Sequence, residues 1–195
     1  MPTRIFFAVF SLIAAATAAL AHPGHATGTD HDFMSGLLHP VTGLDHILAM
    51  VAVGLWAASL GGRAIVAVPA GFATFMAVGF VIALSGAALP YVEPMILGSV
   101  VVLGLMVAVA IRLPAVPAAL LVGLFAVFHG HAHGTEMDGA NALAHGSGFL
   151  IATIALHAAG IGLAAALARL DCRDLPVRAL GAVTAFTVIL VFVAG

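Results

Sequence analysis

The chain has 195 residues, of which 63% are hydrophobic and 7% are charged, and its formal net charge is −2. Soluble domains carry about 25% charged residues, so this composition excludes an ordinary soluble domain. The small negative charge argues against a surface that binds nucleic acid, and a single cysteine excludes an intrachain disulfide. A mean hydropathy of +1.22 therefore predicts an all-α membrane protein in contact with lipid.

The first 21 residues have the pattern of a secretory signal peptide. Arg4 supplies a positive start, an apolar segment follows, and Ala19-Leu20-Ala21 fits a cleavage site. An uncleaved first membrane span is the alternative. Cleavage would leave a mature chain that begins at His22, outside the cytoplasm, with a histidine-rich tail over residues 22–36.

Residues 37–195 are predicted to form a bundle of six transmembrane helices. Their apolar runs are continuous and not alternating, which indicates helices instead of barrel strands, and glycine, proline and polar residues mark the turns between them. The expected spans are 37–60, 64–88, 93–111, 114–133, 141–168 and 177–194. The pattern leaves both a monomer and a homo-oligomer open.

The arginines predict the orientation of these spans. If the spans alternate, five arginines fall on one side: Arg63, Arg112, Arg169, Arg173 and Arg178. The positive-inside rule makes this side cytoplasmic. We therefore expect a multi-pass protein of the cytoplasmic (inner) membrane with both mature termini in the periplasm.

Nine of the ten histidines fall on the other side of the membrane or beyond it. They are His22, His25 and His31 in the tail, His39 and His46 in span one, His129, His131 and His133 in span four, and His145 in span five. Only His157 lies deeper. The tail histidines are candidates for metal capture, with a merely polar linker as the alternative.

The stretch HPVTGLDHILAM, residues 39–50, holds the first candidate site. His39 and His46 are seven residues apart, about two helical turns, and would share a helix face. Asp45 and His46 would lie about three turns into the span. Asp45 would be rotated by about 100° toward a neighbouring helix. Ionisable side chains at such depth are costly unless they are paired or hydrated, which makes them functional candidates. Pro40 and Gly43 are expected to loosen the first turn.

The stretch FHGHAHGTE, residues 128–136, holds the second candidate site. His129 and His133 are four residues apart and share a helix face, which Glu136 would extend, whereas His131 points elsewhere. Imidazole and carboxylate groups suit nickel, copper, zinc and iron. For a single histidine such as His145 or His157, a hydrogen bond between helices is the alternative.

These two motifs, in this order, resemble the HupE/UreJ family of small membrane proteins associated with nickel supply to hydrogenase and urease. The resemblance covers nearly the whole mature chain. It implies nickel import, with cobalt as a second candidate. The first motif is matched by His39, Asp45 and His46, and the second by His129, His133 and Glu136; no role is implied for His131.

The expected activity is that of a secondary permease and not of an enzyme. The chain has no lysine and therefore no Walker A motif for ATP hydrolysis. The metal would be a transported ion and not a permanent cofactor. From the tail it would pass to His39, His133 and His145, then to Asp45, His46 and His129, with His157 as a deeper relay. The rivals are an intramembrane metalloenzyme, a haem-binding electron carrier and a metal sensor without transport.

Overall fold

The structure, a computed structural model, describes residues 32–137, 141–169 and 174–194. Within these ranges the chain forms seven helices and no strand. They are α2 (Phe33–Thr42), α3 (Leu44–Leu60), α4 (Ala64–Leu84), α5 (Val92–Ala108), α6 (Ala115–Thr135), α7 (Ala142–Leu167) and α8 (Leu175–Ala194). The all-helical prediction is confirmed, and the bounds of α4 to α8 agree with the predicted spans within four residues.

Three of the described helices, α4, α6 and α7, are long and apolar enough to cross a membrane. The bent pair α2 and α3 makes a fourth candidate span, and α5 together with the described apolar part of α8 are shorter. Several apolar helices of this length indicate an integral membrane protein. The number of six spans remains a prediction.

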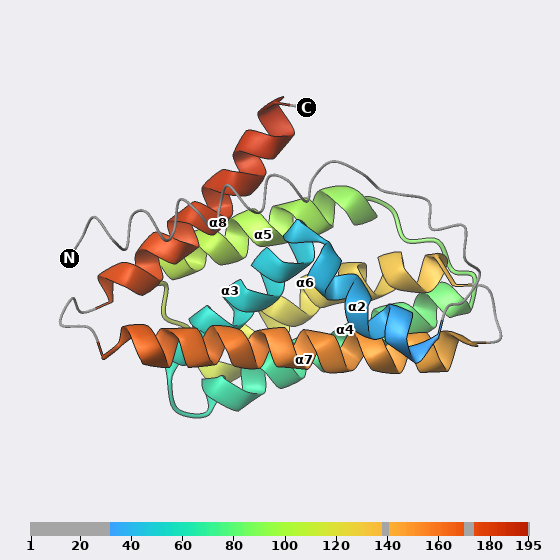
Figure 1. The fold of residues 1–195 in the computed structure, drawn as a ribbon, viewed down its shortest axis with the longest axis horizontal. Helices are drawn as coiled ribbons and strands as arrows, with labels where there is room; N and C mark the ends of the chain where they lie inside the picture. The colour runs from blue at the N-terminus through green and yellow to red at the C-terminus, as the bar shows by residue number, and fades with distance from the viewer. Residues whose placement is uncertain (1–31, 138–140, 170–173, 195) are drawn as a thin grey trace.

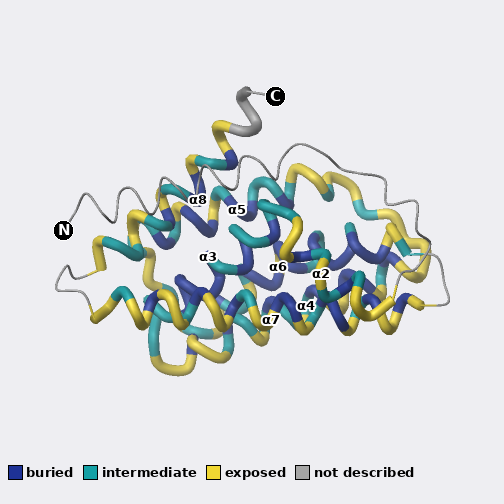
Figure 2. Tube along the Cα trace, in the orientation of Figure 1, coloured by how far each residue is buried: buried dark blue, intermediate teal, exposed yellow. Residues whose placement is uncertain are grey.

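Helix α3 is the central element of the bundle. It packs against α2, α4, α5, α7 and α8, and an almost unbroken run of its residues is buried (Figure 2). Helices α7 and α8 have many exposed residues, and several of these are large apolar side chains. Helix α8 begins beside α5 and then leaves the bundle toward the C-terminus (Figure 1). This arrangement buries His46 of α3 inside the protein and presents apolar side chains outward.

The first predicted span is not one continuous helix, and the prediction for residues 37–60 is wrong in this respect. α2 and α3 are bent by 83° relative to one another. Gly43 between them has an extended backbone, with φ −93° and ψ 123°. Pro40 lacks the backbone N–H that would donate to the preceding turn, and the Thr42 hydroxyl donates to the His39 carbonyl at 2.8 Å. The helix therefore ends at Thr42 and restarts at Leu44.

The bend lays α2 across α7, where glycines allow close contact. A Cβ atom on Gly36 would overlap the backbone carbonyl of His145, and one on Gly148 would overlap the carbonyl of Phe33. Small residues on facing helices permit this backbone approach inside membranes. As a result, α2 packs against α7 and α3, and His39 lies inside the bundle close to His46 and His133.

The predicted signal peptide and the tail histidines His22, His25 and His31 lie outside the described residues. Helix α2 begins at Phe33, inside the segment predicted as a tail. Asp32 caps it, because its carboxylate accepts a hydrogen bond from the Ser35 backbone N–H at 2.7 Å. This is the usual way of satisfying the first unpaired N–H groups of a helix.

Candidate metal centre

Three histidines from three helices meet inside the bundle. His39 of α2, His46 of α3 and His133 of α6 each offer one ring nitrogen, and these nitrogens lie within 4.8 Å of one another. The ring centroid of His133 lies 4.6 Å from that of His39 and 4.7 Å from that of His46. His46 and His133 are only 8% and 2% exposed. We call these three residues the histidine triad.

The protonation of His46 follows from its neighbours. Its Nδ1 lies 2.9 Å from Oδ1 of Asp45, and an ionised carboxylate only accepts hydrogen bonds, so Nδ1–H is the donor. A neutral His46 then carries its lone pair on Nε2. That atom lies 2.6 Å from Nε2 of His133, which must donate a proton to it when no ion is present. The Asp45 carboxylate thus directs the His46 lone pair toward the centre of the triad.

His133 has a carboxylate on its far side as well. Its Nδ1 lies 3.8 Å from Oε2 of Glu136, which is too long for a hydrogen bond but close enough for electrostatic attraction. This interaction with His133 lowers the pKa of the Glu136 carboxyl below its usual value. Glu136 is therefore a carboxylate at neutral pH. When an ion binds Nε2 of His133, the ring proton moves to Nδ1, and Glu136 is placed to accept a hydrogen bond from it after a small movement.

The donor set fits a divalent transition-metal ion. Imidazole nitrogens bind such ions at about 2.1 Å, so two of them on one ion lie about 3.0–3.4 Å apart. The 2.6 Å between the Nε2 atoms of His46 and His133 must open slightly, and the wider spread to His39 must close slightly. Neutral imidazoles favour nickel, cobalt, copper and zinc over magnesium or calcium.

An aromatic wall closes one side of the triad. The ring centroid of Phe149 on α7 lies 4.0 Å from that of His133 and 6.2 Å from that of His39. Phe149 is 1% exposed, so it keeps water from this side of the imidazoles. Exclusion of water strengthens electrostatic interactions within the site.

Comparison with known proteins supports the family resemblance of this chain. The family model described as "HupE / UreJ protein" matches residues 10–191 of this chain. Protein HupE of Rhizobium leguminosarum bv. viciae is 52% identical over 148 residues, which cover 75% of each chain. The chain belongs to the HupE/UreJ family. No solved structure gives a significant match.

In this HupE/UreJ chain the predicted site residue His129 lies one helical turn from His133, beside His46. Its ring centroid is 5.7 Å from that of His46, and the side chain is fully buried. The Ser99 hydroxyl donates its proton to the Ile96 carbonyl, so at 3.0 Å it accepts the Nε2–H of His129. The lone pair of a neutral His129 is therefore on Nδ1, which has no hydrogen-bond partner among the described residues.

His145 lies at the edge of the triad, with its ring centroid 6.2 Å from that of His39. Its Nδ1 lies 3.0 Å from the Ser35 hydroxyl, which itself donates to the Asp32 carbonyl. His145 thus links the first turn of α2 to α7. This position puts His145 near His39, and its part in metal binding stays a prediction.

The remaining two described histidines, His131 and His157, differ in their hydrogen bonding. His131 points away from the triad, as predicted, and its Nε2–H donates to the Ala87 carbonyl at 2.8 Å. His157 is 1% exposed, and neither of its ring nitrogens has a hydrogen-bond partner among the described residues. The described residues therefore supply no hydrogen-bonded bridge through His157, whereas the bond to Ala87 fits a structural role for His131.

Three details of the sequence-based prediction need correction. His39 and His46 do not share a face of one helix; the bend at Gly43 brings them together from two helices, with ring centroids 5.8 Å apart. Asp45 does not reach a neighbouring helix but bonds the adjacent His46. Asp45 and His46 lie in the first turn of α3 and not three turns into a span.

Sequence reasoning missed Ser99 and two phenylalanines, Phe149 and Phe72, that contact the imidazoles. Ser99 left a signal, since it is an isolated polar residue within an apolar run. The phenylalanines left none, because aromatic residues in apolar helices are most often ordinary packing residues.

Proposed function

We propose that this HupE/UreJ protein is a secondary permease that imports divalent nickel, with cobalt as a second candidate, for the maturation of hydrogenase or urease. The ion is a transported substrate that binds reversibly. Neutral imidazoles replace part of its water shell, so that dehydration inside the membrane is compensated.

The proposed route begins at the histidine-bearing tail, where His22, His25 and His31 capture the ion. His39, His46 and His133 form the first buried site, with His145 at its entrance. His129 receives the ion next, and His157 is the deeper relay. Asp45 and Glu136 offset part of the ion's charge, either as ligands or through the imidazoles they adjoin.

The proposed orientation places the triad on the periplasmic side of the cytoplasmic membrane, with both mature termini periplasmic. The support is the distribution of arginines, which favours the opposite side as cytoplasmic. An inside-negative potential would then assist entry of a divalent ion by about 4–5 kcal/mol per 100 mV.

One observation carries the proposal: three imidazoles from separate helices converge inside a bundle of a chain that belongs to the HupE/UreJ family. The 2.6 Å between the Nε2 atoms of His46 and His133 leaves no room for a porphyrin between these rings. A haem-binding electron carrier built on this pair is therefore the weaker reading. The sequence also lacks the H-E-x-x-H motif of many zinc enzymes.

The test is uptake of radioactive nickel by cells that express the protein, competed with cobalt, zinc and copper. We expect uptake above that of the empty host, with His46→Ala reducing it to background at equal expression. Uptake no greater than in the empty host, with the wild-type protein present in the membrane, would refute the permease.

A further inference from the structure

A continuous row of aromatic rings leads from the triad into the centre of the bundle. Ring centroids are 4.7 Å apart for His133 and His46, and 5.7 Å apart for His46 and His129. The next ring is Phe72 of α4, 5.6 Å from His129, and it also lies 5.1 Å from His157. Phe72 therefore contacts imidazoles of both α6 and α7.

The two imidazoles that Phe72 contacts are able to bind an ion, whereas Phe72 is not. Among the described residues, Nδ1 of His129 and both ring nitrogens of His157 have no hydrogen-bond partner. Buried polar atoms without partners are costly and rare, and they call for a functional explanation. Phe72 is fully buried, and its ring offers no lone pair to a dehydrated cation.

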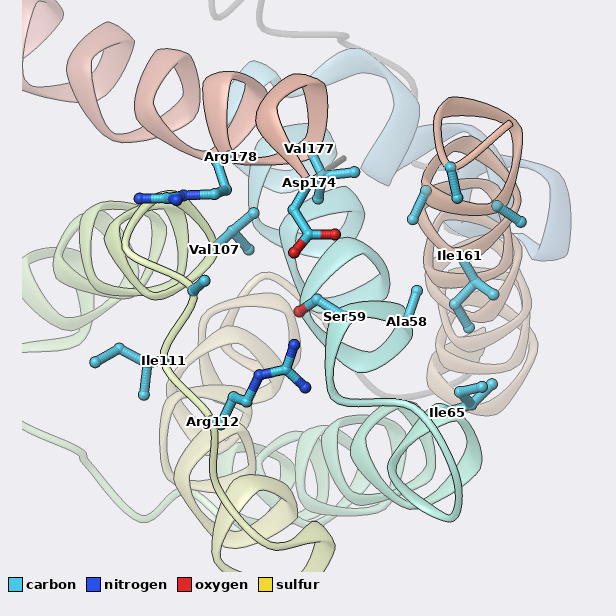
Figure 3. A pocket seen from close by; sticks show the side chains of 14 residues that line it. Ala58, Ser59, Ile65, Val107, Ile111, Arg112, Ile161, Asp174, Val177 and Arg178 are labelled. Carbon is cyan, nitrogen blue, oxygen red and sulfur yellow. The ribbon is translucent and has the colours of Figure 1, made fainter. Parts of the chain in front are cut away.

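Beyond His157 the path reaches a cavity at the other end of α3. Ile161 lies one turn after His157 on the same face of α7 and lines a cavity of about 300 Å³. Figure 3 shows this cavity with Ser59, Arg112 and Asp174 among its lining side chains. Ala58 of α3 also lines it, and twelve residues separate Ala58 from His46, or about 18 Å of helix.

We propose that Phe72 is a gate between two compartments, one formed by the triad and His129 and the other running from His157 into this cavity. The proposal deepens the proposed permease function and rests on it. In this structure the ring contacts both His129 and His157, which is the closed state of the gate. Rotation of the ring away from His129 would let the ion exchange Nδ1 of His129 for a nitrogen of His157.

The helix that carries Phe72 has a local weakness one turn earlier. Pro69 lies inside α4, and its missing N–H removes one backbone hydrogen bond from that turn. Sites of this kind are where helices bend. A small change of bend at Pro69 would move Phe72 relative to α6 and α7.

The test measures access to position 157 from each side of the membrane. His157→Cys in a Cys172→Ser background provides a single thiol, and an impermeant thiol reagent is added either to intact cells or to inside-out vesicles. With Phe72 present, we expect labelling at least tenfold faster from the side of the cavity. Phe72→Ala should raise labelling from the side of the triad at least tenfold.

Phe75→Ala is the matched control. Phe75 lies on the same helix, and its ring faces Gly123 of α6, so its loss should leave labelling from the side of the triad unchanged. Equal labelling from both sides with Phe72 present, or no difference between Phe72→Ala and Phe75→Ala, would overturn the gate.

A second variant protects the test against misfolding and separates the gate from the permease. Phe72→Trp should keep wild-type nickel affinity at the triad in purified protein while slowing nickel import at least tenfold. Import at the wild-type rate would also overturn the gate. If wild-type protein imports no nickel, the permease fails, and thiol labelling alone then decides whether Phe72 separates the two compartments.

Discussion

His46 and His133, 87 positions apart in the sequence, direct their Nε2 atoms at one another across 2.6 Å. Each ring has a carboxylate on its opposite edge, Asp45 at 2.9 Å and Glu136 at 3.8 Å. A carboxylate behind an imidazole fixes the tautomer and increases the basicity of the nitrogen that faces a metal. The pair is therefore preorganised to receive a cation between two helices.

Loss of a triad imidazole should remove metal binding. We expect His133→Ala to weaken nickel affinity at least a hundredfold, measured by titration calorimetry on purified protein. His131→Ala is the control on the same helix, because His131 donates to the Ala87 carbonyl instead of facing the triad. Equal affinities for the two variants would mean that the ion binds elsewhere.

Asp45 is expected to act through His46. Asp45→Asn removes the charge that holds Nδ1–H of His46, and loss of such an outer partner typically costs 10–100-fold in metal affinity. We expect a loss of about this size with the number of imidazoles on bound nickel unchanged, as measured by X-ray absorption. A smaller number of protein ligands in the variant would instead identify Asp45 as a direct ligand.

The bend at Gly43 should be sensitive to a single methyl group. A Cβ atom there would lie 2.9 Å from both Oδ1 of Asp45 and Nδ1 of His46, so Gly43→Ala should displace this pair. We expect at least a tenfold loss of nickel affinity. Gly162→Ala is the control, since a Cβ at that position meets no atom within 4 Å; an equal effect of both substitutions on affinity would argue against the displacement.

Metal binding should weaken in acid. Protons compete with metals for the same imidazole lone pairs, but burial disfavours the charged imidazolium. Nickel binding at limiting concentration should therefore change little just below pH 7 and weaken only well below about pH 6.5, where free imidazole titrates. Calorimetry in buffers of different ionisation enthalpy would measure the protons released in acid and their absence at about pH 7. Import that rises steeply with acidity would point to proton-coupled entry and against simple competition.

The helices were predictable from the sequence, because continuous apolar runs between glycine and proline turns define them. The meeting of the two motifs could also be anticipated, since alternation of spans puts both at one end. The break of the helix at Gly43 was not predictable, although Pro40 and Gly43 indicated that the first turn would be weak. An 83° change of direction depends on the packing of α2 against α7, which no local pattern contains.

The roles of individual side chains were less predictable than their positions. Helix rotation was enough to separate His131 from His133 in the sequence, but the hydrogen bond from His131 to the Ala87 carbonyl was not predictable. The role proposed for Phe72 depends on its contacts with His129 of α6 and His157 of α7. Such contacts between distant segments carry no periodic signal in the chain.

The most direct measurement is X-ray absorption at the nickel edge of the purified, nickel-loaded protein, repeated with His133→Ala and His131→Ala. The triad predicts at least three imidazoles on the ion in the wild-type protein and in His131→Ala, and one fewer in His133→Ala. A wild-type spectrum without imidazole ligands, or one that His133→Ala leaves unchanged at full nickel occupancy, would contradict a nickel site at the histidine triad.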